Sequence, residues 1–185
     1  APANISLGAV ISPVVSINAD DQEDMNVPLD GKAVNAIRSF TGKGTLVWGA
    51  RTLDGNSQDW RYINVRRTMT FLEQSIKSAA EAFVFASNNS ATWTSLRSTV
   101  SNFLNNQWLG GLLEGASPSE AFSVEIGLGA TMSANDVLDG ILRMTVKVAL
   151  VRPAEFLVLT FEQKQNDPGG DAGGEDDGGG EESTE

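Results

Sequence analysis

The 185-residue chain contains no histidine and no cysteine. Without histidine it has no Ser-His-Asp triad, no imidazole general base and no imidazole ligand for zinc. Without cysteine it has no thiol nucleophile, no disulfide and no thiolate metal site. These absences remove most catalytic and metal-binding classes, and they predict a chain that is not an enzyme and uses neither a cofactor nor a metal.

Basic residues are scarce as well, with 13 Lys and Arg against 24 Asp and Glu and a net charge of −11. This balance argues against a nucleic-acid partner, because phosphate contacts need a basic surface. No apolar run approaches the ~20 residues that cross a bilayer, so no direct membrane insertion is predicted. The chain opens at Ala1-Pro2-Ala3-Asn4 with neither a signal peptide nor an initiator Met. We therefore expect it to be either a processed chain or a fragment of a longer protein.

The acidic charge is concentrated at one end of the chain. Residues 166–185 hold eight acidic residues, no basic residue and seven of the 19 glycines, which leaves residues 1–165 with a net charge of −3. The first 165 residues are long enough for one domain with a real core. The last 20 have almost nothing to bury, so we expect them to be a disordered acidic, Gly-rich tail.

Hydrophobic periodicity predicts two long helices. Between Ile63 and Phe83 an apolar stripe includes Val65, Met69 and Leu72 at the helical period. A second helix follows a cap at Asn89 or Ser90 and ends at Gly110-Gly111. Strands are expected at residues 33–40, 45–50, 83–85, 121–126 and 142–150. Residues 4–17 are expected to be extended chain or a strand, residues 20–24 an acidic loop, and residues 133–138 a short turn or a one-turn helix. This order predicts an α+β fold with two helices packed on a mixed β-sheet.

The segment after Arg152-Pro153 is apolar on both faces of a predicted strand. Such a strand needs cover on both sides or a partner along its edge. The predicted strand consists of Glu155, Phe156, Leu157, Val158, Leu159, Thr160 and Phe161.

Other candidate sites are weak. A calcium loop starting at Asp20 fails because Met25 replaces the glycine at its sixth position. The Gly42-Lys43-Gly44 segment lacks the spacing of a phosphate loop, which favours a tight turn between strands. Trp60 beside a carboxylate could bind a glycan, and this alternative stays open.

Several segments together resemble a known family. They are Asn35–Phe40, the Val47-Trp48-Gly49-Ala50-Arg51-Thr52-Leu53 stretch, Trp60-Arg61-Tyr62 with Val65-Arg66-Arg67, Glu73–Ile76, and Val151–Phe156. Over roughly residues 5–165 the chain resembles the C-terminal domain of contractile tail sheath proteins, which occur in phages and in bacterial injection particles. It departs from many relatives after Phe85, where Ala86-Ser87-Asn88 replaces Glu-Pro-Asn, and in its acidic tail.

The resemblance implies a structural subunit that polymerises as stacked six-fold rings around an inner tube and contracts to drive the tube through a target envelope. The implied partners are further copies of the chain, six per ring, the inner tube protein, and baseplate and terminator proteins. Assembly is expected in the bacterial cytoplasm, and the product is part of a phage virion or a released particle. A different tail or baseplate adaptor that uses a sheath-like domain is an alternative.

The resemblance also implies roles for particular residues. Residues 154–165 would form a C-terminal arm whose strand, residues 155–161, is available for exchange between subunits and adds to a neighbour's sheet as the intersubunit strand. Residues 1–30 would form a linker or arm. The N-terminal linker to upstream domains would include Ile5, Leu7, Val10 and Ile11. Cations on exposed helix faces that could contact the tube are Arg66, Arg67, Lys77 and Arg97.

Overall fold

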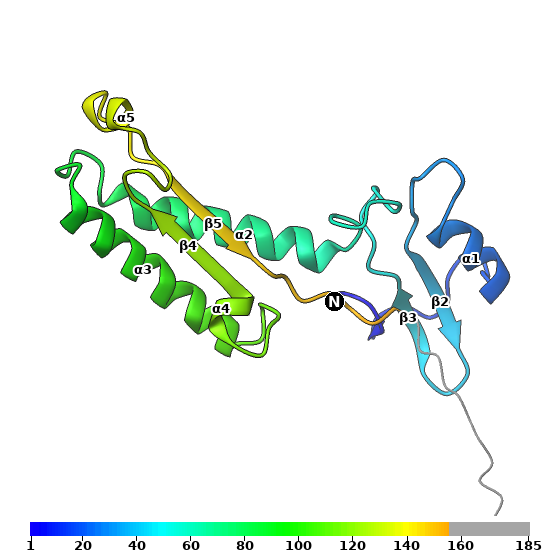
Figure 1. Cartoon of the computed structure of the whole chain (residues 1–185). Helices are drawn as coiled ribbons and strands as arrows, with labels where there is room; N and C mark the ends of the chain where they lie inside the picture. Colours follow the sequence, from blue (N-terminus) through cyan, green and yellow to red (C-terminus); the bar gives the residue numbers. More distant parts are fainter. Residues whose placement is uncertain (156–185) are drawn as a thin grey trace, which may run out of the picture. The chain divides into compact units, whose positions relative to one another are not determined.

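A computed structural model describes residues 1–155. The predicted strand from Phe156 to Phe161 and the tail 166–185 lie outside the described residues. By its internal contacts the chain divides into residues 1–153 and 154–185, and of the second unit only Ala154 and Glu155 are described. None of the described helices is long and apolar enough to cross a membrane. In chain order, the described elements (Figure 1) are β1 (Ile5–Ser6), α1 (Ala19–Asn26), β2 (Ala36–Phe40), β3 (Gly44–Trp48), α2 (Ile63–Glu81), α3 (Ser90–Leu109), α4 (Pro118–Ala121), β4 (Phe122–Ile126), α5 (Ala134–Leu138) and β5 (Met144–Val148).

The α+β class is confirmed. Within residues 1–155 the strands form two antiparallel sheets instead of one mixed sheet. The first has the order β1-β3-β2 and the second pairs β4 with β5. The two long helices α2 and α3 pack beside the second sheet (Figure 1).

The first sheet is built on a tight hairpin. Phe40 pairs with Gly44, and the Lys43 amide donates to the Phe40 carbonyl at 3.1 Å. Gly42 has a φ of 76°, a left-handed conformation that glycine adopts without steric cost. The rings of Phe40 and Trp48 lie 4.6 Å apart between centroids. The predicted turn between two strands is confirmed here.

A buried arginine organises the segment that follows β3. The Arg51 side chain is only 3% exposed, and its Nη1 donates to the carbonyls of Asn26 at 2.8 Å and Gly55 at 3.2 Å. The Asn35 side chain donates to the Arg51 carbonyl at 2.7 Å and accepts from the Arg51 amide at 2.8 Å. A Cβ on Gly49 would lie 2.7 Å from Asn35 Oδ1, so the close approach requires glycine. The Gly49-Ala50-Arg51 segment is therefore bonded to the end of α1 at Asn26, to Asn35 before β2, and to the loop at Gly55.

The core lies between the two long helices and the second sheet. The predicted stripes are confirmed, with Leu72 of α2 and Leu96, Val100 and Leu104 of α3 all buried. Asn89 caps α3, because its side chain accepts from the Thr92 amide at 3.1 Å. Further buried members of the same core are Leu113, Ala121, Ile126 and Met132.

Three predictions of local structure need correction. The acidic segment at 20–24 is not a loop but part of α1, because Asn18 and Asp21 form a capping box and acidic residues in the first turn favour a helix N-terminus. Residues 83–85 form turns instead of a strand, and Phe85 there has a φ of 66°. Of the extended segment 4–17, only Ile5 and Ser6 form a strand.

Candidate functional site

Within residues 1–155, the second sheet has two outer edges that no further strand covers. Phe122 pairs with Val148 and Ile126 with Met144, and these side chains pack on the helices. On the opposite face, Lys147 Nζ lies 3.4 Å from Glu125 Oε1. Each strand of a two-stranded sheet has an outer edge, and within residues 1–155 the outer backbone groups of β4 and β5 make no hydrogen bond to another strand. Such an edge can accept an added strand.

The chain leaves this sheet from an anchored position. Leu150 forms a bridge with Leu113, and the Glu114 amide donates to the Ala149 carbonyl at 2.8 Å. From α2, Asn64 Nδ2 donates to the Val151 carbonyl at 3.0 Å. Arg152 forms a 3.8 Å ion pair with Asp59. The segment before the predicted C-terminal arm is therefore held from several sides. Of the predicted intersubunit strand only Glu155 is described, and it is half-buried.

The predicted N-terminal linker residues do not act as one group. Ile5 pairs with Val47, and the Leu7 amide donates to the Thr45 carbonyl at 2.9 Å, so both lie along the edge of β3. Val10 and Ile11 lie outside any strand with exposed side chains.

The four predicted tube-facing cations are exposed but fall into separate places. Arg66 and Lys77 are eleven positions apart on α2, about three turns, so they share one face. Arg66 also lies over the Trp60 ring, 5.1 Å from its centroid. Arg67 belongs to a neighbouring face of α2. Arg97 is on α3 and donates to the Ile126 carbonyl at the end of β4, so it already has a structural partner.

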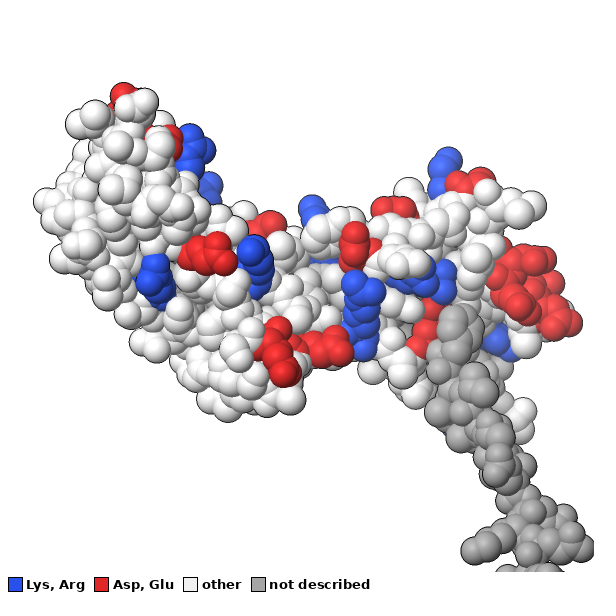
Figure 2. Space-filling view, in the orientation of Figure 1, with Lys and Arg blue, Asp and Glu red and all other residues white. Residues whose placement is uncertain are grey.

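On the face shown in Figure 2, the basic side chains of the described residues are scattered among other residues. On the same face, acidic side chains gather over α1, and basic and acidic residues are interspersed elsewhere. Among residues 1–155, no three acidic side chains come close enough to hold a metal ion.

A cavity of about 410 Å³ lies beside the start of α2 and the end of β5. Its apolar wall includes Val65, Met69 and Val148, while Asp59, Glu114 and Arg152 supply charge. Trp60 also lines it and is 37% exposed. The apolar stripe of α2 predicts that Met69 lies in the core. In the structure it is half-buried beside this cavity, because the C-terminal part of β5 and the residues after it form another wall.

At the other end of α2, α5 is fixed by a capping box. The Ser133 amide donates to Asp136 Oδ2 at 2.9 Å, and Arg143 Nη2 lies 3.2 Å from Asp136 Oδ1. These bonds, the backbone bond from Ser133 first among them, hold the pKa of Asp136 below its usual value. The predicted helical turn at 133–138 is thus confirmed as α5.

Comparison with known proteins finds one family along much of the chain. The family described as the phage tail sheath C-terminal domain matches residues 56–164. The tail sheath protein of Vibrio phage KVP40 is 32% identical over 82 residues, which cover 44% of this chain and 12% of that protein. The tail sheath protein of Enterobacteria phage T4 is 26% identical over 114 residues, covering 61% of this chain and 17% of that protein. The matched regions are therefore small parts of these curated relatives.

Solved structures match a longer part of this chain than the curated relatives do. The sheath complex of an extracellular contractile injection system, PVC, in its contracted state is 40% identical with a TM-score of 0.84. The helical sheath of the anti-feeding prophage in its contracted state is 38% identical with a TM-score of 0.81. Both comparisons cover 89% of this chain and 45% of the other, so the chain spans about half the length of these structural relatives.

Proposed function

Because the chain belongs to the family of phage tail sheath C-terminal domains, we propose that it is a structural, non-enzymatic subunit of a contractile sheath. In this proposal, copies stack as six-fold rings around an inner tube, and contraction drives the tube through a target envelope. The observation that carries the proposal is the match over 89% of the chain to a contracted sheath complex at 40% identity. Assembly takes place in the bacterial cytoplasm, and the product is a phage tail or a released injection particle.

The proposed link between copies is strand addition. The intersubunit strand of the C-terminal arm, residues 155–161, leaves its own copy and pairs with an outer edge of the β4–β5 sheet of a neighbour. Two features support this: the described sheet has only two strands, and the chain is anchored at Leu150 and Val151 just before the arm. Backbone hydrogen bonds then supply affinity, while the anchor transmits force between copies.

Contraction in this scheme needs no nucleotide. The extended sheath is the less stable arrangement, and the contracted one buries more surface between copies, which lowers its free energy. The strand links persist while the rings rotate. The baseplate and terminator proteins hold the two ends of the polymer.

Contact with the inner tube is assigned to exposed cations of α2. Arg66, Arg67 and Lys77 suit this role because their side chains are exposed. Arg97 suits it less, since it is bonded to the Ile126 carbonyl. Reversing the charge of Lys77 should weaken assembly around the tube, and unchanged assembly would remove this assignment. The segment of Ile5, Leu7, Val10 and Ile11 is proposed to lead toward upstream domains.

A baseplate adaptor is the second candidate. It is favoured by the anti-feeding prophage baseplate, solved with six-fold symmetry: a chain of that structure is 38% identical to this one, and the match covers 89% of this chain and 45% of that chain. Microscopy separates the two functions, because an adaptor forms a single ring whereas a sheath subunit forms long striated polymers.

The strand-addition proposal is tested by two truncations assembled with the cognate inner tube protein. Removing residues 154–185 should abolish sheath polymers, because it deletes the arm and the tail. Removing only residues 166–185 is the matched control and should leave polymers intact. Circular dichroism verifies that both proteins remain folded. Sheaths of normal length from the longer truncation would refute the proposed link.

A further inference from the structure

The turn between α2 and α3 exposes an aromatic side chain on a strained backbone. Phe85 has a φ of 66°, and its side chain is fully exposed at 104%. A bulky residue rarely adopts the left-handed conformation, which costs roughly 1–2 kcal/mol. Exposing a phenyl ring to water is unfavourable as well. Strain of this kind is typical of functional positions, where surrounding structure compensates for it.

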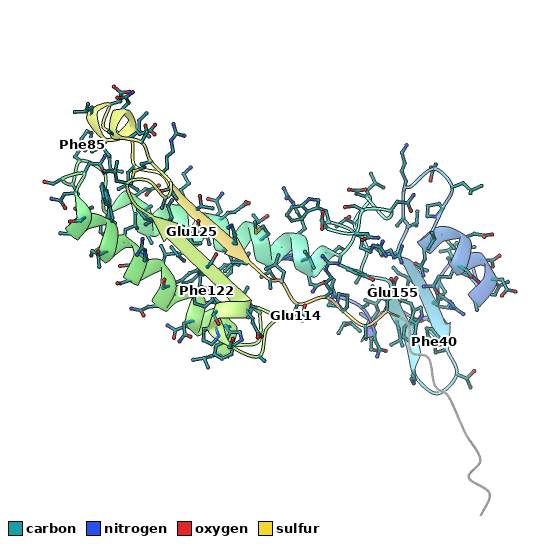
Figure 3. The ribbon with its side chains drawn as sticks, in the orientation of Figure 1. Phe40, Phe85, Glu114, Phe122, Glu125 and Glu155 are labelled. Carbon is teal, nitrogen blue, oxygen red and sulfur yellow. The ribbon has the colours of Figure 1, made fainter. Side chains whose placement is uncertain are left out.

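Other apolar side chains share this end of the fold. Val84, next to Phe85, is exposed, and so are Leu138 of α5 and Ile141. Asn88 Nδ2 donates to the Ile141 carbonyl at 3.2 Å, which ties the turn to the segment after α5. Figure 3 shows Phe85 at the same end of α2 and α3 as α5. We call Val84, Phe85, Leu138 and Ile141 the apolar knob.

The 410 Å³ cavity lies at the opposite end of α2 from the apolar knob. Its apolar wall comes from Val65 and Met69 in the first two turns of α2, whereas the knob follows the last turn of that helix. The 19 residues of α2 span about 28 Å at 1.5 Å per residue. A copy therefore cannot fill its own cavity with its own knob.

We propose that the apolar knob of one copy inserts into this cavity of a second copy, with Phe85 seated between Trp60 and Met69. The inference rests on the proposed sheath function and specifies a second contact between copies besides strand addition. An indole ring and a thioether are both favourable neighbours for a phenyl ring. The knob carries no charged residue, and the charged lining residues Asp59, Glu114 and Arg152 are exposed, so they can stay hydrated when the knob is seated.

We take a second copy as the occupant because a relative 38% identical to this chain is part of a helical sheath, in which copies must contact one another through different surfaces. In each copy the cavity lies beside the start of α2 and the knob follows its end, so every copy can insert one knob and accept one. A head-to-tail contact of this type generates rings or helical polymers. This matches the helical sheath of the structural relative.

Cross-linking tests the contact directly, because the chain has no cysteine of its own. Phe85→Cys protein is mixed with Met69→Cys protein and oxidised. In the control, Phe85→Cys protein is mixed with Ser98→Cys protein, whose cysteine occupies an exposed position on α3. The experiment is run on assembled sheaths and on the concentrated chain alone. The proposal predicts a disulfide-linked dimer from the Phe85 and Met69 pair and little from the control pair. Equal yields, or sheaths without the predicted dimer, would overturn it.

The outcome separates this contact from the sheath function. Normal sheaths without the cross-link overturn the knob contact and leave the sheath function standing. A wild-type chain that forms no polymer with its tube overturns the sheath function, and cross-linking of the chain alone still decides the contact.

A polar substitution gives an independent measure. Asn tolerates the left-handed conformation, so Phe85→Asn should leave the thermal midpoint unchanged or raise it. It should raise the concentration needed for assembly by about 10- to 100-fold, because one buried phenyl ring is lost per contact. Phe85→Tyr, which keeps a ring, should restore most of the assembly. Assembly of the Asn variant at the wild-type concentration contradicts the proposal, and Phe85→Gly repeats the measurement if the Asn variant is unfolded.

Discussion

Replacing Gly49 with alanine should destabilise the fold by breaking the contact that organises the segment after β3. The new Cβ would lie 2.7 Å from Asn35 Oδ1 and 3.0 Å from Asn35 Cα, so the backbone of Asn35 has to move. Steric overpacking costs about 1–3 kcal/mol. The two hydrogen bonds between Asn35 and the Arg51 backbone add about 1 kcal/mol each when lost. The expected loss is about 3–5 kcal/mol.

Urea unfolding followed by circular dichroism measures this loss, with two matched glycines as controls. Gly8→Ala meets nothing within 4 Å and has no unusual φ, so its stability should equal or slightly exceed that of the wild type. Gly42→Ala also meets nothing, but its φ of 76° predicts a loss of about 1–2 kcal/mol. The reasoning is refuted if Gly49→Ala is no less stable than Gly42→Ala.

Three further outcomes are expected. Leu104→Ala, at a 0% exposed position of α3, should lower the free energy of unfolding by about 2–5 kcal/mol in the same assay. The pKa of Asp136 is lowered in the fold, so its carboxylate stabilises the fold above its unfolded pKa, and this contribution is lost as the pH falls through the folded pKa. Between pH 6 and pH 3, the free energy of unfolding of Asp136→Asn should therefore fall less than that of the wild type. Equal losses would contradict the assignment. If the acidic residues of 166–185 keep copies apart by repulsion, removing them should lower solubility, measured as the concentration left after centrifugation, whereas unchanged solubility counts against this role.

The sequence predicts those parts of the fold in which one local signal dominates. The period of α2 and α3, the Asn89 cap and the alternation in β5 all appear in the structure as expected. In these segments the apolar positions recur over many residues, so the pattern by itself indicates the type of element and its buried face. The Val47–Leu53 motif could be recognised as a resemblance. The physical role of this motif, which lies in the buried Arg51 side chain and the close approach of Gly49 to Asn35, could be found only from the structure.

Other features depend on partners that are distant in the sequence. The run of acidic residues at 20–24 looks like a solvated loop, yet Gln22 is buried and donates to the Trp48 carbonyl at 2.5 Å, which secures α1 against β3. The apolar Phe83–Phe85 run suggests a strand. Only three residues separate Phe85 from the Asn89 cap, and a turn is needed to join two packed helices. The cavity beside Trp60 could not be predicted, because its walls come from α2 and β5.

The central claim is that the C-terminal arm of one copy lies in the sheet of another. Electron cryo-microscopy of the full chain assembled with its inner tube tests it most directly, because the path of residues 154–161 can be traced from the anchored Val151. The account predicts striated six-fold sheaths in which this segment pairs with β4 or β5 of a neighbour. Sheaths in which the segment pairs only with strands of its own copy would contradict it.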